Sequence, residues 1–343
     1  MTVELGSLAA LEPALSAEGF FDRDDVVANV YIGYGCSDVL RRSATPPPPE
    51  PCSLPAVAYS IDAPDDPLPQ GGGYSVGTWR ASWTETEYAD AVDAVRAAIA
   101  EGDVYQVNLV QHLSAEFDGD PLGLARALVP LDPLEPRPLT GAGWAIVSAS
   151  PELLLSRRGS RIVTSPIKGT RPAGVPIESD KDAAEHVMIV DLERNDLSRV
   201  AVPGSVRWPE LLAERQLAGV SHLVATVEAE LQEDVTLTEL LEAVLPGGSV
   251  TGCPKIAALD LIAALEPVGR GASMGALGRI HPNGDLDLAL TIRTFAIADG
   301  RIHLWVGGGI VWDSDPAEEV EESWVKARPL LAAIGAPLPA PVS

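Results

Sequence analysis

The sequence contains few cysteines, few basic residues and no long apolar run. Its three cysteines, Cys36, Cys52 and Cys253, are too few and too irregularly spaced for a disulfide framework or a zinc site. Lys and Arg total 24 against 49 Asp and Glu, so the formal net charge of −25 would repel nucleic-acid phosphates and anionic lipids. Met1–Gly6 does not resemble the start of a signal peptide, and no stretch approaches the length of a membrane span. We therefore expect no nucleic-acid or membrane partner and a reducing, cytoplasmic setting.

The rest of the composition is that of a globular chain. Apolar residues make up 46% of the 343 residues and charged residues 21%, which is enough for a sizeable core in one large domain or two ordinary ones. We expect a short N-terminal segment over residues 1–78 packed on the core, a main domain over 79–335 and a mobile tail over 336–343. The proline-rich connector at 43–51 should be extended and should not join the packed core.

Strand-like segments follow one another mostly in consecutive pairs, with helical segments inserted singly or in twos. A helix should begin after Thr84, a capping residue, and end at Gly102. Further helices are expected at 121–129, from 180, and at 237–244, 255–265 and 316–334. Strands are expected at 55–60, 104–113, 144–150, 153–156, 161–164, 200–208, 221–231, 275–280, 286–296 and 301–306, the last broken by the glycines at 307–309. This order predicts an α+β architecture with large antiparallel sheets rather than regular βαβ winding.

One lysine, Lys168, lies between an apolar residue and a glycine in the segment Ser165–Pro172. Because a strand-like segment precedes it, Lys168 should leave that strand and enter a tight turn. Gly169 would allow positive φ or a close approach to a ligand, and Pro172 prevents the turn from continuing as a helix. An exposed loop lysine is the common case, so the segment alone assigns no function.

Two predicted helices each carry a pair of carboxylates on one face. Asp182 and Glu185 are three residues apart, and so are Glu319 and Glu322. Four converging carboxylates can hold Mg²⁺, which prefers oxygen ligands and would let an acidic protein bind a carboxylate substrate. The alternative is a pair of solvated helix faces, because 49 acidic residues produce such spacings by chance.

Several other polar or glycine-rich features admit two interpretations. Gly247–Lys255 departs from the phosphate-loop pattern, but its amides could cradle a carboxylate where the next helix begins. Arg293 ends an apolar strand and would need an anion, whereas His222 opens another and is more often a satisfied core histidine. Gly307–Gly309 would allow a ligand to approach the backbone, or would form a bulge. No Gly-x-Ser-x-Gly nucleophile elbow is present.

Six ordered motifs resemble those of the chorismate-utilising enzymes. They are Pro166–Pro172, Glu185–Leu197, His222–Thr226, Gly247–Lys255, Thr291–Thr294 and Gly307–Ser314. They occur in that family's order and spacing over about residues 84–331. The resemblance implies antiparallel sheets packed as a sandwich with helices on the outside, and it makes 79–335 a chorismate-binding catalytic domain.

Within the family, Lys168 and the segment 102–109 resemble the para-aminobenzoate branch, since relatives that make anthranilate usually carry alanine in place of the lysine. The resemblance implies that Lys168 attacks C2 of chorismate while Glu152, the general acid, protonates the leaving C4 hydroxyl. Ammonia then adds at C4 and expels the lysine. Since no glutaminase signature is present, the ammonia must come from a separate glutamine amidotransferase subunit or from solution. Attack requires a neutral amine, so we expect a dry pocket beside cationic groups to lower the pKa of Lys168.

The resemblance also implies roles for the other candidate residues. Glu185 and Glu322 match the Mg²⁺ ligands, with Asp182 and Glu319 acting through water. His222, the third candidate catalytic residue, lines the ring side of the substrate together with Ser249. Arg293, Gly307 and Gly309 match the grip on the pyruvyl carboxylate. The full substrate-binding set is Thr170, Ser249, Thr251, Gly252, Arg293, Gly307, Gly308, Gly309 and Lys326.

The chain departs from the family pattern at a few places. Asp182 stands where glutamate is common, Ser273 where many relatives have an aromatic residue, and Cys253 where alanine is usual. The N-terminal segment is shortened and carries no Leu-Leu-Glu-Ser-like motif, so a tryptophan-binding pocket is not expected. Two alternatives remain open: the anthranilate-forming reaction, and a catalytically silent chorismate-binding subunit.

Overall fold

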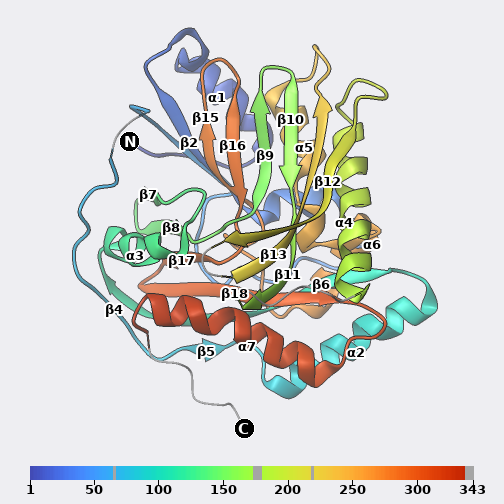
Figure 1. Ribbon diagram of the computed structural model, residues 1–343. Coiled ribbons are helices and arrows are strands. Elements are labelled where there is room, and N and C mark those ends of the chain that lie inside the picture. Colours follow the sequence, from blue (N-terminus) through green and yellow to red (C-terminus); the bar gives the residue numbers. More distant parts are fainter. Residues whose placement is uncertain (65–66, 173–179, 218–219, 337–343) are drawn as a thin grey trace.

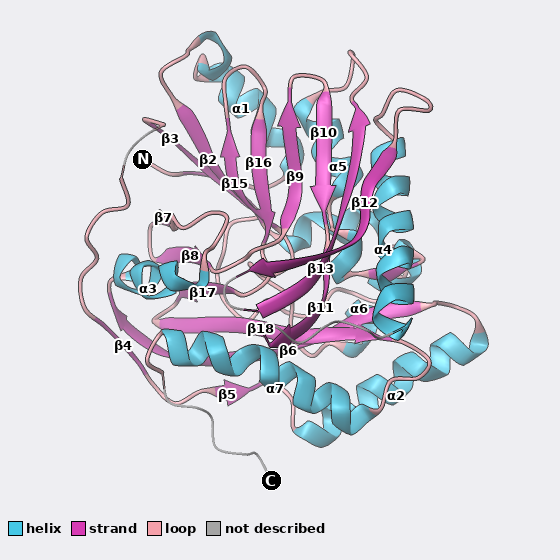
Figure 2. Cartoon of the chain, viewed as in Figure 1, coloured by secondary structure: helices cyan, strands magenta, loops and turns pink. Residues whose placement is uncertain are grey.

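The computed structural model describes residues 1–64, 67–172, 180–217 and 220–336, without the side chains at 169–172, 180–184, 216–217 and 220–222. These residues form two antiparallel sheets whose strands run in different directions, with helices around them (Figures 1 and 2). The prediction of an α+β fold with large antiparallel sheets is confirmed. Within the described residues, no helix combines the length and the apolarity needed to cross a membrane.

The larger sheet has ten strands in the order β1-β3-β2-β15-β16-β9-β10-β13-β11, with β12 paired to β13. In chain order these strands are β1 (Val3–Leu5), β2 (Val27–Ile32), β3 (Val57–Asp62), β9 (Leu153–Arg158), β10 (Arg161–Ser165), β11 (Ile167–Pro172), β12 (Arg207–Leu217), β13 (Val220–Glu230), β15 (Ala276–Ile280) and β16 (Leu286–Leu290). The prediction of a strand at 200–208 is wrong. Ala201 forms an isolated bridge, and the strand in this part of the chain, β12, begins at Arg207.

The smaller sheet has eight strands in the order β14-β6-β18-β17-β8-β7, with β4 and β5 also paired to β6. They are β4 (Tyr74–Val76), β5 (Arg80–Ala81), β6 (Gln106–Gly119), β7 (Leu139–Gly141), β8 (Trp144–Ser148), β14 (Gly252–Cys253), β17 (Thr294–Ala298) and β18 (Arg301–Ile310). The glycines at 307–309 neither break β18 nor form a bulge, since β18 pairs with β6 in unbroken register from Arg301 to Ile310.

The single strand expected at 286–296 is two strands in two different sheets. β16 ends at Leu290 in the larger sheet and β17 begins at Thr294 in the smaller one. Between them Arg293 has φ +50°, a left-handed conformation that turns the chain from one sheet to the other. Apolarity continues through the switch because both strands are buried, so the sequence pattern gives no sign of it.

The helices cover the outer faces of the sheets. They are α1 (Leu11–Ala17), α2 (Glu85–Glu101), α3 (Pro121–Leu128), α4 (Asp180–Ser198), α5 (Leu237–Val244), α6 (Lys255–Leu265) and α7 (Pro316–Ala333). The predicted cap at Thr84 is confirmed: its side chain accepts from the Glu87 amide, and the Glu87 carboxylate accepts from the Thr84 amide. In Figure 1, α7 lies along β18 and α4 stands beside β12 and β13.

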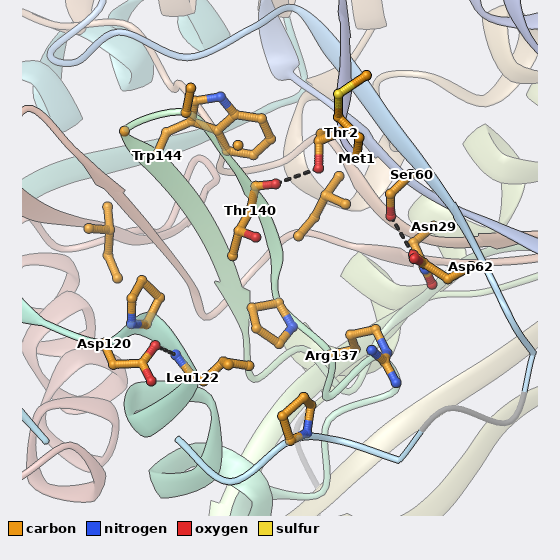
Figure 3. Close-up of a pocket in the computed structure, with 18 residues that line it drawn as sticks. Met1, Thr2, Asn29, Ser60, Asp62, Asp120, Leu122, Arg137, Thr140 and Trp144 are labelled. Carbon is orange, nitrogen blue, oxygen red and sulfur yellow. Dashed lines mark hydrogen bonds between the residues drawn. The ribbon is translucent and has the colours of Figure 1, made fainter. Parts of the chain in front are cut away.

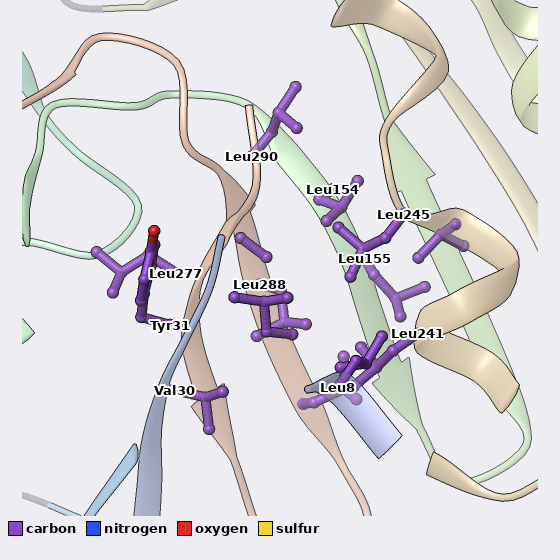
Figure 4. Close-up of a cluster of buried hydrophobic side chains, with 14 of the residues drawn as sticks. Leu8, Val30, Tyr31, Leu154, Leu155, Leu241, Leu245, Leu277, Leu288 and Leu290 are labelled. Atoms are coloured by element: carbon purple, nitrogen blue, oxygen red, sulfur yellow. The ribbon is translucent and has the colours of Figure 1, made fainter. Parts of the chain in front are cut away.

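The two sheets share one buried core. Alternation along β8 directs Trp144 and Ile146 towards the larger sheet, while Ala145 and Val147 face the helices α3 and α7. Figure 4 shows Leu241 of α5 next to Leu155 of β9, with Leu288 of β16 beside them. This shared core holds the ends of both sheets in fixed positions, and the candidate site lies where they meet.

Residues 1–78 contribute three strands to the larger sheet, and β2 pairs directly with β15. The proline-rich connector is exposed over most of its length, and its last residues form hydrogen bonds to the body of the chain. The Pro49 carbonyl accepts from the Gly269 amide at 2.8 Å, and Glu50 accepts from the Gly271 amide at 2.9 Å. The tail at 337–343 lies outside the described residues.

Candidate active site

Lys168 and Glu152 meet at a single residue, Ser249. Lys168 lies on β11, Glu152 lies in the turn before β9, and Ser249 belongs to the short helix η5 (Gly248–Val250). The Lys168 Nζ donates to the Ser249 carbonyl at 3.1 Å, and the Ser249 hydroxyl donates to Glu152 Oε1 at 2.6 Å. A candidate nucleophile and a candidate proton donor are therefore brought together by a third segment of the chain.

Glu152 is held by the turn between β8 and β9 and is 4% exposed. Its amide donates to the Ser150 hydroxyl at 3.3 Å, and its carbonyl accepts from the Leu290 amide at 2.9 Å. Burial raises the pKa of Glu152 to about 6, although the Ser249 hydrogen bond and the Lys168 charge oppose the rise. A carboxyl group with this pKa keeps part of its proton near neutral pH, as a general acid must.

Lys168 differs from expectation in two ways. It lies within strand β11 rather than in a tight turn, and the register with β13 shifts immediately after it. Its pKa is raised, not lowered: burial lowers the pKa, but the charges of Glu185, Glu152 and Glu322 outweigh burial. The nearest of these oxygens, Glu185 Oε1, is 3.0 Å from the Lys168 Nζ. The amine is therefore held as an ammonium until these carboxylates are neutralised in another way.

Glu185 is shared between Lys168 and the amide of Gln106. Gln106, 1% exposed on β6, donates to Glu185 Oε1 at 2.7 Å. A Cβ placed on Gly309 of β18 would lie 2.8 Å from the same oxygen and 2.0 Å from Gln106 Nε2. Gly309 thus leaves room for this pair of side chains. Sequence reasoning missed Gln106, although a polar residue beginning an apolar strand was a usable signal.

Glu319 and Glu322 approach the neighbouring glycine from α7. A Cβ on Gly308 would lie 3.1 Å from Glu322 Oε1 and 3.2 Å from Glu319 Oε2. Lys326, one turn further along α7, is 2.7 Å from Glu322 and also donates to the Gly307 carbonyl at 2.7 Å. The predicted i, i+3 pair therefore faces the sheet and is not simply a solvated helix face.

Three of the four predicted metal ligands thus flank the backbone of Gly308–Gly309. The side chain of the fourth, Asp182, lies outside the described residues, as do those of Thr170 and His222. Among the residues that are described, no group of three acidic, histidine or cysteine side chains is close enough together to hold a metal ion. Glu185 and Glu322 are instead each paired with a lysine.

Arg293 presents a half-buried cation at the switch between the sheets. Its carbonyl accepts from the Ala149 amide at 3.0 Å, which fixes the backbone. Burial lowers the pKa of its guanidinium, and the charge of Glu152 opposes this. No hydrogen bond or ion pair of the guanidinium is found among the described residues, so it is available to an anion.

Three further predicted substrate-binding residues make contacts that serve the fold. The Thr251 hydroxyl donates to the Gly247 carbonyl at 3.0 Å. Gly252 has φ +145°, and a Cβ there would lie 2.2 Å from the Gln106 carbonyl. A Cβ on Gly307 would lie 1.9 Å from the Leu109 carbonyl, so this glycine is required by the pairing of β18 with β6.

A wide cleft elsewhere in the molecule is separate from these residues. It has a volume of about 980 Å³ and lies between the N-terminal strands and the segment around β7. Figure 3 shows Asn29, Asp62 and Arg137 on one side of it and Asp120 on the other. None of the predicted catalytic, substrate or metal residues lines this cleft.

Comparison with known proteins agrees with the geometry. The family model described as chorismate binding enzyme matches residues 39–332. Anthranilate synthase component 1 of Thermus thermophilus is 43% identical over 283 residues, covering 78% of this chain and 61% of the relative. Aminodeoxychorismate synthase component 1 of Salmonella typhimurium is 39% identical over 268 residues, covering 74% and 58%.

A solved structure has the same fold. Anthranilate synthase component I from Streptococcus pneumoniae superposes with a TM-score of 0.79 at 25% identity, covering 91% of this chain and 84% of the other. The chain spans about three fifths of the length of the two curated relatives above. Since the family model covers most of the chain and both relatives exceed 30% identity, the chain belongs to the chorismate-binding enzymes.

Proposed function

We propose that this chain is component I of an aminodeoxychorismate synthase, which replaces the C4 hydroxyl of chorismate with an amino group. One observation carries the proposal: the amine of Lys168 lies in the same buried site as Glu152, joined to it through Ser249. An alanine at this position, as is usual in the anthranilate branch, could provide no nucleophile. Relatives named for both branches match at similar identity, so Lys168 is the feature that favours amination.

The proposed reaction is a pair of substitutions that balances as chorismate plus ammonia giving 4-amino-4-deoxychorismate plus water. In the first, the neutral Lys168 amine bonds to C2, both ring double bonds shift, and the C4–oxygen bond breaks. Glu152 donates its proton to the departing hydroxyl, which leaves as water. In the second, ammonia bonds to C4, both double bonds shift back, and the C2–nitrogen bond to Lys168 breaks, while the pyruvyl ether is retained.

We propose that Mg²⁺ binds between the acidic residues around Gly308–Gly309, which would have to move closer together than they are among the described residues of this structure. Three carboxylates from α4 and α7 point at backbone that carries no side chain, and carboxylate oxygens are the ligands that Mg²⁺ prefers. We propose Glu185 and Glu322 as direct ligands, with Glu319 and Asp182 acting through water. When bound, Mg²⁺ would offset the charge of a substrate carboxylate. Once Glu185 is so engaged it stabilises the Lys168 ammonium less, and the neutral amine becomes accessible.

Two cations remain for the carboxylates of the substrate. Arg293 is half-buried at the sheet switch without an ion pair among the described residues, and a guanidinium binds a carboxylate through two parallel hydrogen bonds. Lys326 donates to the Gly307 carbonyl and lies beside Glu322, one of the proposed metal ligands. We assign Arg293 to the pyruvyl carboxylate, with Lys326 as a second carboxylate partner.

Ammonia would come from a second subunit. Relatives on both branches are named component 1, which implies a separate component, and the sequence has no glutaminase signature of its own. We propose a glutamine amidotransferase as that partner. Free ammonium at high concentration should replace it in the assay.

The second candidate function is anthranilate synthesis, favoured by the 43% identity to the Thermus thermophilus relative. The two reactions share chorismate and the proposed metal but release different products. The purified chain is incubated with chorismate, MgCl₂ and ammonium, and the products are separated by chromatography and identified by mass. We expect 4-amino-4-deoxychorismate, whereas anthranilate as the main product would overturn the proposal.

A further inference from the structure

One buried carboxylate beside the site has no role in the reaction proposed above. Glu193 lies on α4, two turns beyond Glu185, and is 2% exposed. A carboxylate this deeply buried is costly unless its hydrogen bonds and charge are used. The groups that hydrogen-bond to Glu193 should therefore show why it is buried here.

Glu193 binds the turn that precedes Ser249. Its Oε1 accepts from the Gly248 amide at 2.9 Å, and its Oε2 receives only a long contact from the Thr164 hydroxyl at 3.4 Å. A Cβ on Gly248 would lie 3.0 Å from Glu193 Oε1 and 2.8 Å from Leu192 Cδ2. The backbone of the turn is thus packed directly against α4, with no room for a side chain between them.

A second tie holds the other end of the same turn. Lys255 of α6 donates to the Pro246 carbonyl at 2.7 Å and to Asp196 of α4 at 2.5 Å. The segment from Pro246 to Gly248 is therefore fixed to α4 at both ends. The residue that follows it, Ser249, is the one that contacts both Lys168 and Glu152.

We propose that Glu193 is a positioning residue for the reaction, acting through the Gly248 amide to hold Ser249 where it joins Lys168 and Glu152. The inference rests on the proposed function of Lys168 and Glu152.

The charges around Glu193 define the expected pH effect. Burial and the charges of Asp196 and Glu152 raise the pKa of Glu193 to about 7, against the opposing charge of Lys255. Asp196 in turn is balanced by Lys255 and Arg199. Glu152, with a pKa of about 6, loses its proton while Glu193 is still mostly protonated and uncharged. Replacing Glu193 by a neutral residue should therefore leave the loss of the Glu152 proton at the same pH.

The test compares Glu193→Ala, Glu193→Gln and a matched control, Glu135→Ala. Glu135 is also a buried glutamate that accepts a backbone amide, from Arg137 at 3.0 Å, but it lies outside the site. For each folded variant, kcat and KM for chorismate consumption with ammonium and MgCl₂ are measured across pH. Consumption is used because the amination and anthranilate reactions share it, so the identity of the product tests the proposed function separately.

Glu193→Ala should lose at least tenfold in kcat with KM for chorismate within twofold, because the turn loses its anchor while the substrate cations stay in place. Glu193→Gln can still accept from the Gly248 amide, so it should keep its maximal kcat within about threefold. Its falling pH limb should stay in place, because Glu193 is mostly uncharged at the pH where Glu152 loses its proton. Glu135→Ala should lower the melting temperature without changing kcat or the pH profile.

Two results would overturn the proposal: a folded Glu193→Ala variant with kcat within twofold of the unmodified chain, or a Glu193→Gln variant whose kcat falls as far as that of Glu193→Ala. A purely structural role would lower stability in both variants and leave the kcat of the folded protein unchanged. If Glu193→Ala does not fold, Glu193→Met replaces it, since methionine fills a similar volume without an acceptor for the Gly248 amide, and the same twofold limit applies.

Discussion

At the scale of single residues, the site is a balance of charges around one amine. Lys168 has its pKa raised because Glu185, Glu152 and Glu322 together outweigh its burial. The same lysine must lose its proton to act as a nucleophile. A raised pKa and a neutral nucleophile are compatible if the carboxylates stabilise the Lys168 ammonium only in the resting protein. When substrate binds, Glu185 and Glu322 would bind the divalent cation instead and would stabilise the ammonium less.

Replacing Lys168 tests its covalent role most directly. Lys168→Ala should reduce formation of the aminated product at least about a hundredfold, the order expected when a group that reacts covalently is removed. Lys168→Met is the matched variant, since it keeps most of the side-chain volume without an amine. Both should bind chorismate with little loss, measured by calorimetry. Amination at the unmodified rate in either variant would exclude the covalent route.

Glu152 gives a prediction that couples activity to stability. Its pKa in the folded chain, about 6, lies above the ordinary 4.5, so the folded state binds more protons than the unfolded state between these values. Stability should therefore fall as pH rises from about 4.5 to 6, by about 2 kcal/mol for this shift. Activity that depends on the protonated acid should fall as pH rises through about 6.

Glu152→Gln should accordingly be inactive yet more stable than the unmodified chain at pH 7, because no buried charge forms. Activity is followed by product formation, and the free energy of unfolding by urea titration at pH 4.5 and 7. The variant's advantage at pH 7 should disappear at pH 4.5. A variant destabilised at pH 7, or one that keeps its activity, would contradict the assignment.

At the scale of elements, strand β18 shows that neighbouring glycines can be required for different reasons. Gly307→Ala would force a Cβ to 1.9 Å from the Leu109 carbonyl, which is backbone and cannot move without breaking the pairing with β6. Gly309→Ala would meet the far end of the Gln106 side chain and Glu185. We expect the first variant to fold poorly and the second to fold well.

Gly309→Ala should instead lose activity, because Gln106 and Glu185 must be displaced from their present positions. The concentration of MgCl₂ giving half-maximal activity should rise severalfold, as Glu185 is a proposed ligand. Melting curves and a Mg²⁺ titration of activity, for both variants, separate the effects. Equal Mg²⁺ dependence in folded Gly309→Ala and the unmodified chain would count against Glu185 as a ligand.

The elements themselves were predictable to different degrees. Helix α2 was clear from Thr84 and Gly102, because capping is a local property of the sequence. The turn from β16 to β17 was not, since the switch at Arg293 depends on which sheet each strand joins. The strand around Lys168 is not predictable from the local sequence either, since β11 forms by pairing with β13, which is distant in the chain. The motifs located the site residues, but the contacts of Ser249 and Gln106 come only from tertiary packing.

At the scale of the whole molecule, the N-terminal segment belongs to the same folded unit as the site. β2 pairs with β15, which continues through β16 to β9, the strand that begins next to Glu152. The connector adds backbone contacts to Gly269 and Gly271. Since these contacts run without a break across the larger sheet, we expect the described parts of the chain to unfold in one cooperative step.

Phe20 provides the test of this cooperativity. It is fully buried in the core shared by both sheets, although it lies far from the site in sequence. Phe20→Ala should lower the free energy of unfolding by about 3–5 kcal/mol, the usual cost of emptying a buried aromatic position. The exposed Val39, in the same N-terminal segment, serves as the control, and Val39→Ala should change stability by less than about 0.5 kcal/mol.

The measurement follows two signals during heating: far-ultraviolet circular dichroism for the whole chain and residual chorismate consumption for the site. In Phe20→Ala both should move to lower temperature together, because loss of β2 leaves β15 and then β9 without their neighbours. An early transition in dichroism with activity preserved to the original temperature would show that residues 1–78 fold separately from the sheet that carries Glu152.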